Sequence, residues 1–154
     1  CKGFIMTIKQ QLYLQCVEYC NNRLEVIKNT IVEIQESLTS ETKSSAGDKH
    51  ETGRAMLQLE REKAGNQLAE TEKLQELLTK IDVNKSSKTV CLGSLVFTTQ
   101  ANYFIAISAG ELVIESKKYY AISPNTPIGK LLIGKQVGDL VSFREQEFKV
   151  VSVW

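Results

Sequence analysis

The sequence predicts an α+β fold: an N-terminal antiparallel α-helical coiled-coil hairpin, followed by a small antiparallel β-sheet domain with one short helix. Three observations predict it. Residues 7–82 contain no proline and carry apolar residues at helical spacing. A short polar segment interrupts this pattern once, and beyond residue 88 the apolar period becomes two, as in strands. We therefore expect a hairpin over residues 7–82, a linker over 83–87 and a second domain over 88–154.

The first helix is predicted by apolar residues that alternate steps of four and three, which is a heptad seam. The seam residues are Tyr13, Val17, Cys20, Leu24, Ile27, Ile31, Ile34 and Leu38. Neither proline nor glycine interrupts them, so one long helix is expected, with Leu38 as its last seam residue. Residues 39–47 are rich in Ser, Thr, Lys and Gly, and this composition is typical of a loop.

A second helix is expected from about Asp48 to Asp82, with a less regular seam. That seam consists of Leu57, Ala64, Leu68, Thr71, Leu74, Leu78 and Ile81. A short connection between two long amphipathic helices favours an antiparallel hairpin. Asp48 and Glu51 would then lie at its tip, roughly 35–45 Å from the base at ~1.5 Å per residue.

The C-terminal part is expected to form strands joined by turns. Apolar alternation predicts strands over 90–98, 102–108 and 119–122, with a turn at Ala109-Gly110. Residues 126–132 are expected to form a short helix, because Thr126 suits the N-cap, Pro127 the first helical position and Gly134 the exit. A closing hairpin is expected around residues 144–147.

Composition excludes several classes of protein. A formal net charge of +1 does not favour strong non-specific nucleic-acid binding, and no apolar run approaches the ~18 residues of a membrane span. The four cysteines are Cys1, Cys16, Cys20 and Cys91, and no two of them form a CxxC pair. A zinc site is therefore not expected, and we expect free thiols in a reducing cytoplasm. No nucleophile–base set or phosphate loop is present, which disfavours a stand-alone enzyme.

Two stretches resemble a known family. Gly47-Asp48-Lys49-His50-Glu51 resembles the tip of the bacterial Gre-type transcript-cleavage factors (GreA/GreB-like), where G-D-x-x-E-N-A-E-Y opens the second coiled-coil helix. The segment from Ser123 to Val141 resembles their C-terminal pattern S-P-x-G-x-A-L-[IL]-G-K-x-x-G-D-x-V, and is the more specific of the two. The order of coiled coil and FKBP-like domain also agrees, so the resemblance covers nearly the whole chain.

The resemblance implies a function in transcription elongation. Gre factors bind bacterial RNA polymerase through the globular domain and insert the coiled coil into its secondary channel. Two tip carboxylates there help to hold a catalytic Mg²⁺, so that the polymerase cuts a backtracked RNA. Asp48 and Glu51 match these catalytic, metal-holding acids, because Mg²⁺ prefers oxygen ligands and keeps several waters.

Further expectations follow from the same resemblance. The protein would have no cofactor of its own, since Mg²⁺ is held jointly with the polymerase, and it would reach DNA and RNA only through the elongation complex. We expect a cytoplasmic monomer that contacts no membrane. Lys130 and Lys135 are candidate partner-binding residues, with plain solubilising charges as the other interpretation.

The tip departs from the family pattern. Thr52-Gly53-Arg54-Ala55 stands where the family has Asn-Ala-Glu-Tyr, and Lys49 and Arg54 add positive charge that weakens metal binding. Asp48-x-x-Glu51 also fits a helix N-cap with a capping-box acid. The alternative function is therefore a non-catalytic coiled-coil interaction module or a channel-binding inhibitor of transcription.

Overall fold

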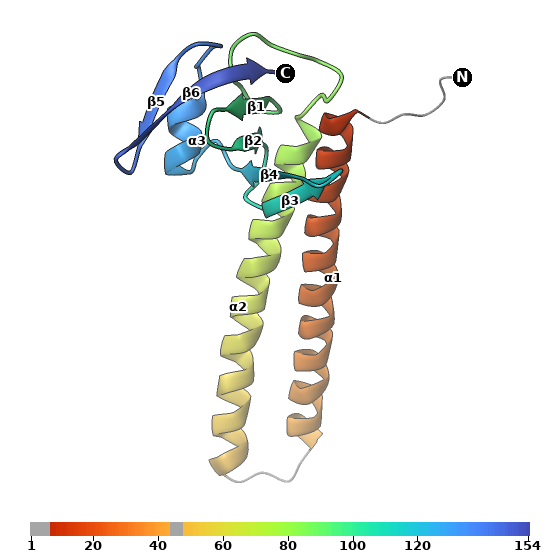
Figure 1. The fold of residues 1–154 in the computed structure, drawn as a ribbon. Helices are drawn as coiled ribbons and strands as arrows, with labels where there is room; N and C mark the ends of the chain where they lie inside the picture. Colours follow the sequence, from red (N-terminus) through yellow and green to blue (C-terminus); the bar gives the residue numbers. More distant parts are fainter. Residues whose placement is uncertain (1–6, 44–47) are drawn as a thin grey trace, which may run out of the picture. The chain divides into compact units, whose positions relative to one another are not determined.

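The fold is α+β, with long N-terminal helices followed by a six-stranded sheet and one short helix, as the sequence predicts (Figure 1). The structure, a computed structural model, describes residues 7–43 and 48–154, and the side chains of residues 41–52 lie outside this description. The elements in chain order are α1 (Ile8–Lys43), α2 (Asp48–Thr79), β1 (Leu95–Thr98), β2 (Asn102–Ile105), β3 (Gly110–Ile114), β4 (Lys117–Ile122), α3 (Pro127–Leu132), β5 (Leu140–Phe143) and β6 (Gln146–Val153).

The chain divides into two compact units. One consists of residues 20–75, the distal parts of α1 and α2. The other combines residues 7–19 with 76–154, so that the start of α1 and the end of α2 belong to the same unit as the sheet.

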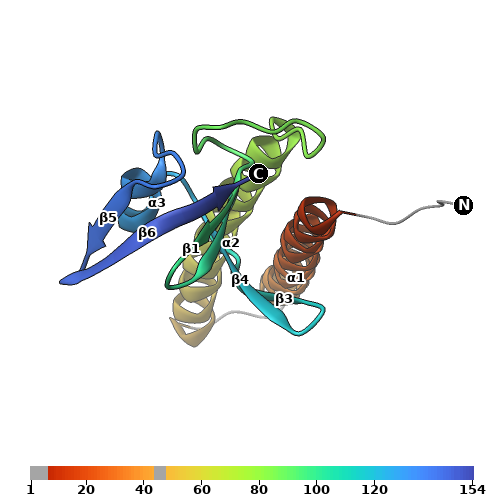
Figure 2. The same ribbon diagram turned by 45° about the horizontal axis from the view of Figure 1, so that its top comes forward.

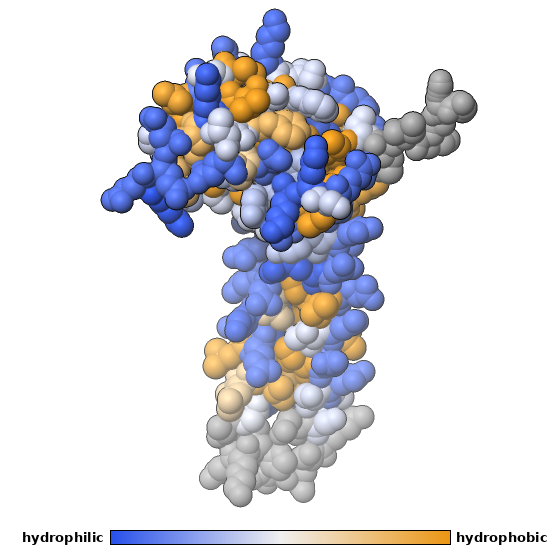
Figure 3. Space-filling model, viewed as in Figure 1, coloured by the Kyte–Doolittle hydropathy of each residue, from blue (hydrophilic) through white to orange (hydrophobic). Residues whose placement is uncertain are grey.

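In the unit of residues 20–75 the two helices run in opposite directions (Figure 1), and part of the predicted seam is buried. Its buried residues include Cys20, Leu24, Ile27, Ile34, Ala64 and Thr71. Thr71 is polar, and its hydroxyl donates to Gln67 O at 2.8 Å within its own helix. Polar side chains predominate on the helical surface shown in Figure 3. These facts agree with a two-stranded, solvent-facing helical pair.

The first helix is longer than the sequence predicts. The expected end at Leu38 is wrong, because α1 continues to Lys43. Residues 39–43 contain no helix breaker, and the Thr39 hydroxyl donates to Gln35 O at 3.0 Å, one turn back. Serine and threonine lower helix propensity only modestly, so a loop-like composition alone did not end the helix.

At the base of α1 a second apolar row is buried that the heptad seam does not include. Leu12 and Cys16 are fully inaccessible to solvent. The Tyr13 hydroxyl donates to Leu78 O at 3.0 Å, and Gln15 Nε2 donates to Val113 O at 3.3 Å, which places β3 beside this part of α1. The base of α1 therefore contacts both α2 and the sheet.

The sheet has the strand order β3-β4-β2-β1-β6-β5. Most neighbours are antiparallel, but β2 and β4 pair in parallel, which departs from the expected purely antiparallel sheet. Strand β3 lies where only a turn was expected. The sequence reasoning missed it because the turn to β4 uses Glu115 and Ser116, both at positive φ, instead of the Asn-Gly or Asp-Gly pair typical of such turns.

The core of the sheet unit gathers around β1, β6 and α3 (Figure 2). Leu132 of α3 is fully buried, and it shares the core cluster with Val90, Val96, Ile105, Val141, Phe148 and Val150. The closing hairpin β5–β6 is confirmed, with Arg144 and Glu145 at positive φ in its turn. Within the described ranges, no helix is long and apolar enough to cross a membrane.

Candidate functional site

The segment that resembles the Gre pattern forms a tightly capped helix. Thr126 is the N-cap of α3: its hydroxyl accepts from Gly129 N at 3.1 Å and donates to Ser123 O at 2.7 Å. Pro127 occupies the first helical turn, where its missing N–H has no partner to lose. The predicted short helix and its cap are therefore confirmed, and the hydroxyl at 126 joins the helix to the preceding loop.

Gly129 is required by close approach to that same loop. A Cβ built on Gly129 would lie 2.2 Å from Ser123 O, 2.8 Å from Thr126 Oγ1 and 3.1 Å from Pro124 Cα. The nearest of these atoms belongs to backbone, which cannot move aside as a flexible side chain does. The glycine of the helix thus holds the Ser123-Pro124 loop against the first turn of α3.

The exit of α3 is fixed by backbone hydrogen bonds to the start of the sheet domain. Gly134 has φ +86° and its N–H donates to Val90 O at 2.9 Å, while Val90 N donates to Lys135 O at 2.9 Å. These two bonds form a reciprocal pair around Val90, which is buried. The glycine is needed because an L side chain is strained at this φ.

A second turn completes the segment. Gln136 N donates to the Asp139 carboxylate at 2.8 Å, and Asp139 N donates to Gln136 O at 3.0 Å. Gly138 has φ +96°, and its N–H donates to Val150 O at 2.8 Å. Most of the pattern residues therefore serve to shape this segment, and the side chains that remain exposed are the ones available to a partner.

Six of the accessible side chains of this segment are basic or apolar, and we call them the α3 surface; Gln136 and Asp139 are exposed beside them in the chain. Its members are Lys130, Leu131, Ile133, Lys135, Val137 and Leu140. The apolar members are between 38% and 60% exposed, Lys130 is exposed and Lys135 is half-buried. Neither lysine forms an ion pair with any described residue. Exposed aliphatic side chains beside unpaired lysines suit contact with an acidic protein surface.

The side chains of the two tip acids, Asp48 and Glu51, lie outside the described residues. The backbone of α2 begins at Asp48, so Glu51 lies in its first turn. Their catalytic and metal-holding roles stay predictions. Within the described part of the chain, no group of His, Cys, Asp and Glu is placed to hold a metal ion.

One group of residues was missed by the sequence reasoning. Lys9, Lys85 and Ser94 line a hollow at the linker after α2, and Lys9 is only 7% exposed. Lys9 precedes the predicted seam and belongs to no recognised motif, so nothing in the sequence pattern predicts that it is buried.

Comparisons with known proteins give a similarity in structure but none in sequence family. No protein-family model matches the chain, and no curated protein matches it. Among solved structures, the GreA factor homolog 1 (Gfh1) protein of Thermus thermophilus is similar at 20% sequence identity and a TM-score of 0.35. The match covers 89% of this chain and 93% of that chain. A fold likeness of this size carries no information about activity.

Proposed function

We propose that this protein is an accessory factor of bacterial RNA polymerase of the Gre type. In this proposal the α3 surface binds the polymerase, and the helical hairpin enters the secondary channel and modulates cleavage of backtracked RNA. The protein itself is not an enzyme; it acts inside the polymerase, in the cytoplasm, as a monomer.

The observation that carries the proposal is the structure of residues 123–141. Several residues that resemble the Gre pattern have a defined structural role in this segment. Thr126 caps α3, Gly129 allows close approach of the loop, and Gly134 and Gly138 adopt positive φ. The match therefore includes positions that the fold of this segment constrains. The hairpin, which precedes this segment along the chain, supports the same proposal.

The chemistry would be supplied at the tip. Asp48 and Glu51 would offer carboxylate oxygens to a Mg²⁺ ion held mainly by the polymerase, and such a metal activates the attacking water and stabilises the leaving oxygen. This chain would contribute ligands and position, and the polymerase would contribute the remaining ligands and the RNA.

A second candidate is favoured by the altered tip. Lys49 and Arg54 place positive charge close to the two acids, which lowers their attraction for a metal cation. Such a tip favours a protein that occupies the secondary channel without stimulating cleavage and so inhibits other factors that enter it. The two candidates share the binding mode and differ in the outcome at the active site.

The test uses backtracked elongation complexes assembled with the polymerase of the same organism. Metal-dependent shortening of the RNA from its 3′ end, lost in the Asp48→Ala, Glu51→Ala double variant, would support a cleavage factor. Absence of cleavage, with competition against a known cleavage factor, would support the inhibitor. Absence of binding and of any effect would refute both candidates.

The α3 surface is tested by charge reversal. Lys130→Glu with Lys135→Glu is expected to weaken polymerase binding, measured by co-elution or by competition. Lys117→Glu with Lys149→Glu is the matched control, because these lysines are also exposed and lie elsewhere on the sheet. Equal binding by both double variants would refute the assigned surface while leaving the tip experiment valid.

A further inference from the structure

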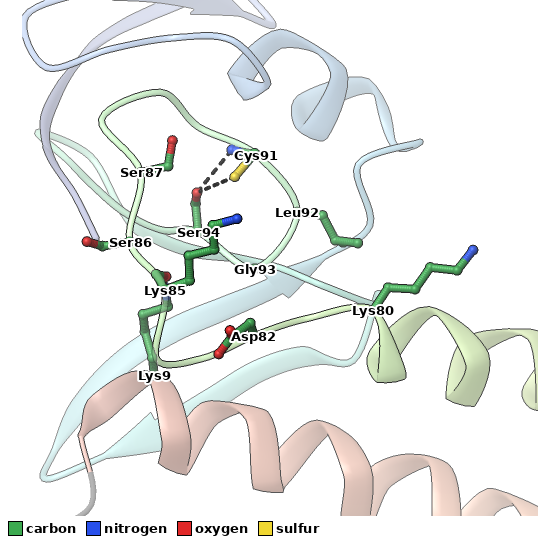
Figure 4. Close-up of a pocket in the computed structure, with 10 residues that line it drawn as sticks. All are labelled: Lys9, Lys80, Asp82, Lys85, Ser86, Ser87, Cys91, Leu92, Gly93 and Ser94. Atoms are coloured by element: carbon green, nitrogen blue, oxygen red, sulfur yellow. Dashed lines mark hydrogen bonds between the residues drawn. The ribbon is translucent and has the colours of Figure 1, made fainter.

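A basic hollow lies where the linker after α2 meets the turn before β1. Its volume is about 370 Å³, and Lys9, Lys80, Asp82, Lys85, Ser86 and Ser94 are among the residues that line it (Figure 4). All of them belong to the unit that contains the sheet. Three lysines against one aspartate give the hollow a net positive charge, so it favours an anion.

Lys9 is the residue that makes this hollow unusual. It is 7% exposed, and its Nζ donates to Lys85 O at 2.9 Å. An ammonium carries three N–H donors, and Lys85 O is the one acceptor that the described residues give it. Burial lowers the pKa of Lys9, while negative charge on Cys91 and on the Asp82 carboxylate opposes that shift. A bound anion would satisfy the remaining donors and favour the charged form.

Further donors lie on the two segments that form the walls. The backbone N–H groups of Ser86, Ser87 and Leu92 donate to no acceptor within the described ranges of the chain. The Ser94 hydroxyl accepts from Cys91 N at 3.0 Å and lies 3.5 Å from Cys91 Sγ, a contact in which either atom can be the donor (Figure 4). Lysine ammonium groups, free amides and hydroxyls together are the donors that bind phosphate oxygens. Lys80 points away from the other side chains in Figure 4, so Lys9 and Lys85 are the central cations.

A second hollow adjoins the first and has a different character. Its volume is about 430 Å³, and it shares Lys9, Lys85 and Ser86 with the basic hollow. Its remaining lining includes Val153 and Trp154. The Trp154 ring packs against Phe97 at a centroid distance of 5.5 Å, yet half of the residue is exposed. A braced and accessible indole is suited to stacking on a planar ring.

We propose that the two hollows together form a binding site for a nucleotide. Its phosphates would lie between Lys9 and Lys85 in the basic hollow, and its base would stack on Trp154 in the adjoining one. The combined space falls in the range usual for small-molecule sites, ~300–1,000 Å³. The site shares no residue with the α3 surface or the tip, so it is independent of the proposed function.

Trp154 is the only tryptophan of the chain, so intrinsic fluorescence reports directly on the stacking position. The full chain is titrated with ATP and with GTP, and separately with inorganic triphosphate and with adenosine. The expected result is saturable quenching by the nucleotides and weaker binding at higher salt, since the phosphate contacts are electrostatic. Inorganic triphosphate should compete for the site without quenching.

Lys85→Gln is the informative variant, because Lys85 is exposed and its backbone carbonyl still accepts from Lys9. Loss of one charged donor should weaken nucleotide binding about tenfold. Lys117→Gln, an exposed lysine of β4, is the matched control and should leave affinity unchanged. Circular dichroism spectra equal to wild type show that both variants fold.

Three results would overturn the proposal. One is absence of quenching and of binding heat at nucleotide concentrations on the order of millimolar, the range of weak specific binding. A second is equal affinity for inorganic triphosphate and nucleotide without a tryptophan response, which would mean an anion site that does not recognise a nucleotide. The third is equal weakening by Lys85→Gln and Lys117→Gln, which would mean non-specific charge attraction.

Discussion

Gly129→Ala tests whether close packing under α3 sets the shape of the docking segment. The added methyl carbon would lie 2.2 Å from Ser123 O and 2.8 Å from the Thr126 hydroxyl oxygen. Both contacts are far inside van der Waals distance, and the first is with backbone. The loop at Ser123-Pro124 must therefore move away from the helix, or α3 must shift and disturb Leu132 in the core.

The expected sign is opposite to that of a simple helix substitution. Glycine to alanine inside a helix normally stabilises by about 0.5–1 kcal/mol. Here overpacking costs about 1–3 kcal/mol, and displacing the Thr126 cap costs about 1 kcal/mol more. The net expectation is a loss of about 1–3 kcal/mol. For a unit of this size, such a loss lowers the melting temperature by on the order of 10 °C.

Gly65→Ala is the matched control, because Gly65 also lies within a helix, the α2 helix. Among the described residues, the only nearby atom that its Cβ would meet is Arg61 Nη1 at 3.1 Å, the end of a flexible side chain. This variant is expected to gain about 0.5–1 kcal/mol. Urea unfolding is followed by Trp154 fluorescence for the sheet unit and by circular dichroism at 222 nm for the helices.

Gly129→Ala should move the fluorescence midpoint to lower urea, and Gly65→Ala should move the circular dichroism midpoint to higher urea. A Gly129→Ala protein that is as stable as wild type, or more stable, would refute the packing argument. It would also mean that close packing does not require glycine at position 129 of the 123–141 segment.

Three further predictions concern single side chains. Tyr119→Phe should raise the free energy of unfolding by about 1 kcal/mol, because the Tyr119 hydroxyl is buried without a hydrogen-bond partner in the described part of the chain; an unchanged or lower urea midpoint would contradict this. Thr126→Ala should cost about 1 kcal/mol through loss of the α3 cap and Thr126→Ser should restore most of it, whereas equal stability of the two variants would show that the cap contributes nothing. Burial holds the pKa of Lys9 below its ordinary value of 10.5, so the unfolded chain binds more protons at pH values just below 10.5. There the stability of wild type should rise with pH relative to Lys9→Met, and parallel pH profiles would contradict this.

Sequence reasoning succeeded where one local rule determines the outcome. The heptad seam located Cys20, Leu24, Ile27 and Ile34 in the helical core because a step of three or four keeps one helical face. The cap at Thr126 was found because its hydroxyl acts within a single turn of chain. Local chemistry of this kind is readable without knowledge of the tertiary fold.

Sequence reasoning failed where distant segments meet. The parallel pairing of β2 with β4 depends on how the chain crosses between the two strands, and no local residue pattern predicts it. Burial of Leu12, Cys16 and Lys9 follows from the base of α1 lying within the unit that contains the sheet. The candidate site divides in the same way: Asp48, Glu51, Lys130 and Lys135 were named from a linear pattern, whereas the lysine hollow exists only after folding.

The interleaving of the two units has a consequence for chain length. Because residues 7–19 and 76–154 form one unit, the whole segment Cys20–Gln75 is an insertion whose two ends must be brought together when that unit forms. The entropy of closing such a loop varies only with the logarithm of its length, so halving or doubling the insertion changes the free energy by about 0.6 kcal/mol. Removing or adding matched turns in both arms should therefore leave the sheet folded. Folding of the sheet unit therefore places little constraint on the length of α1 and α2. That length can change with the distance that the helical pair has to span.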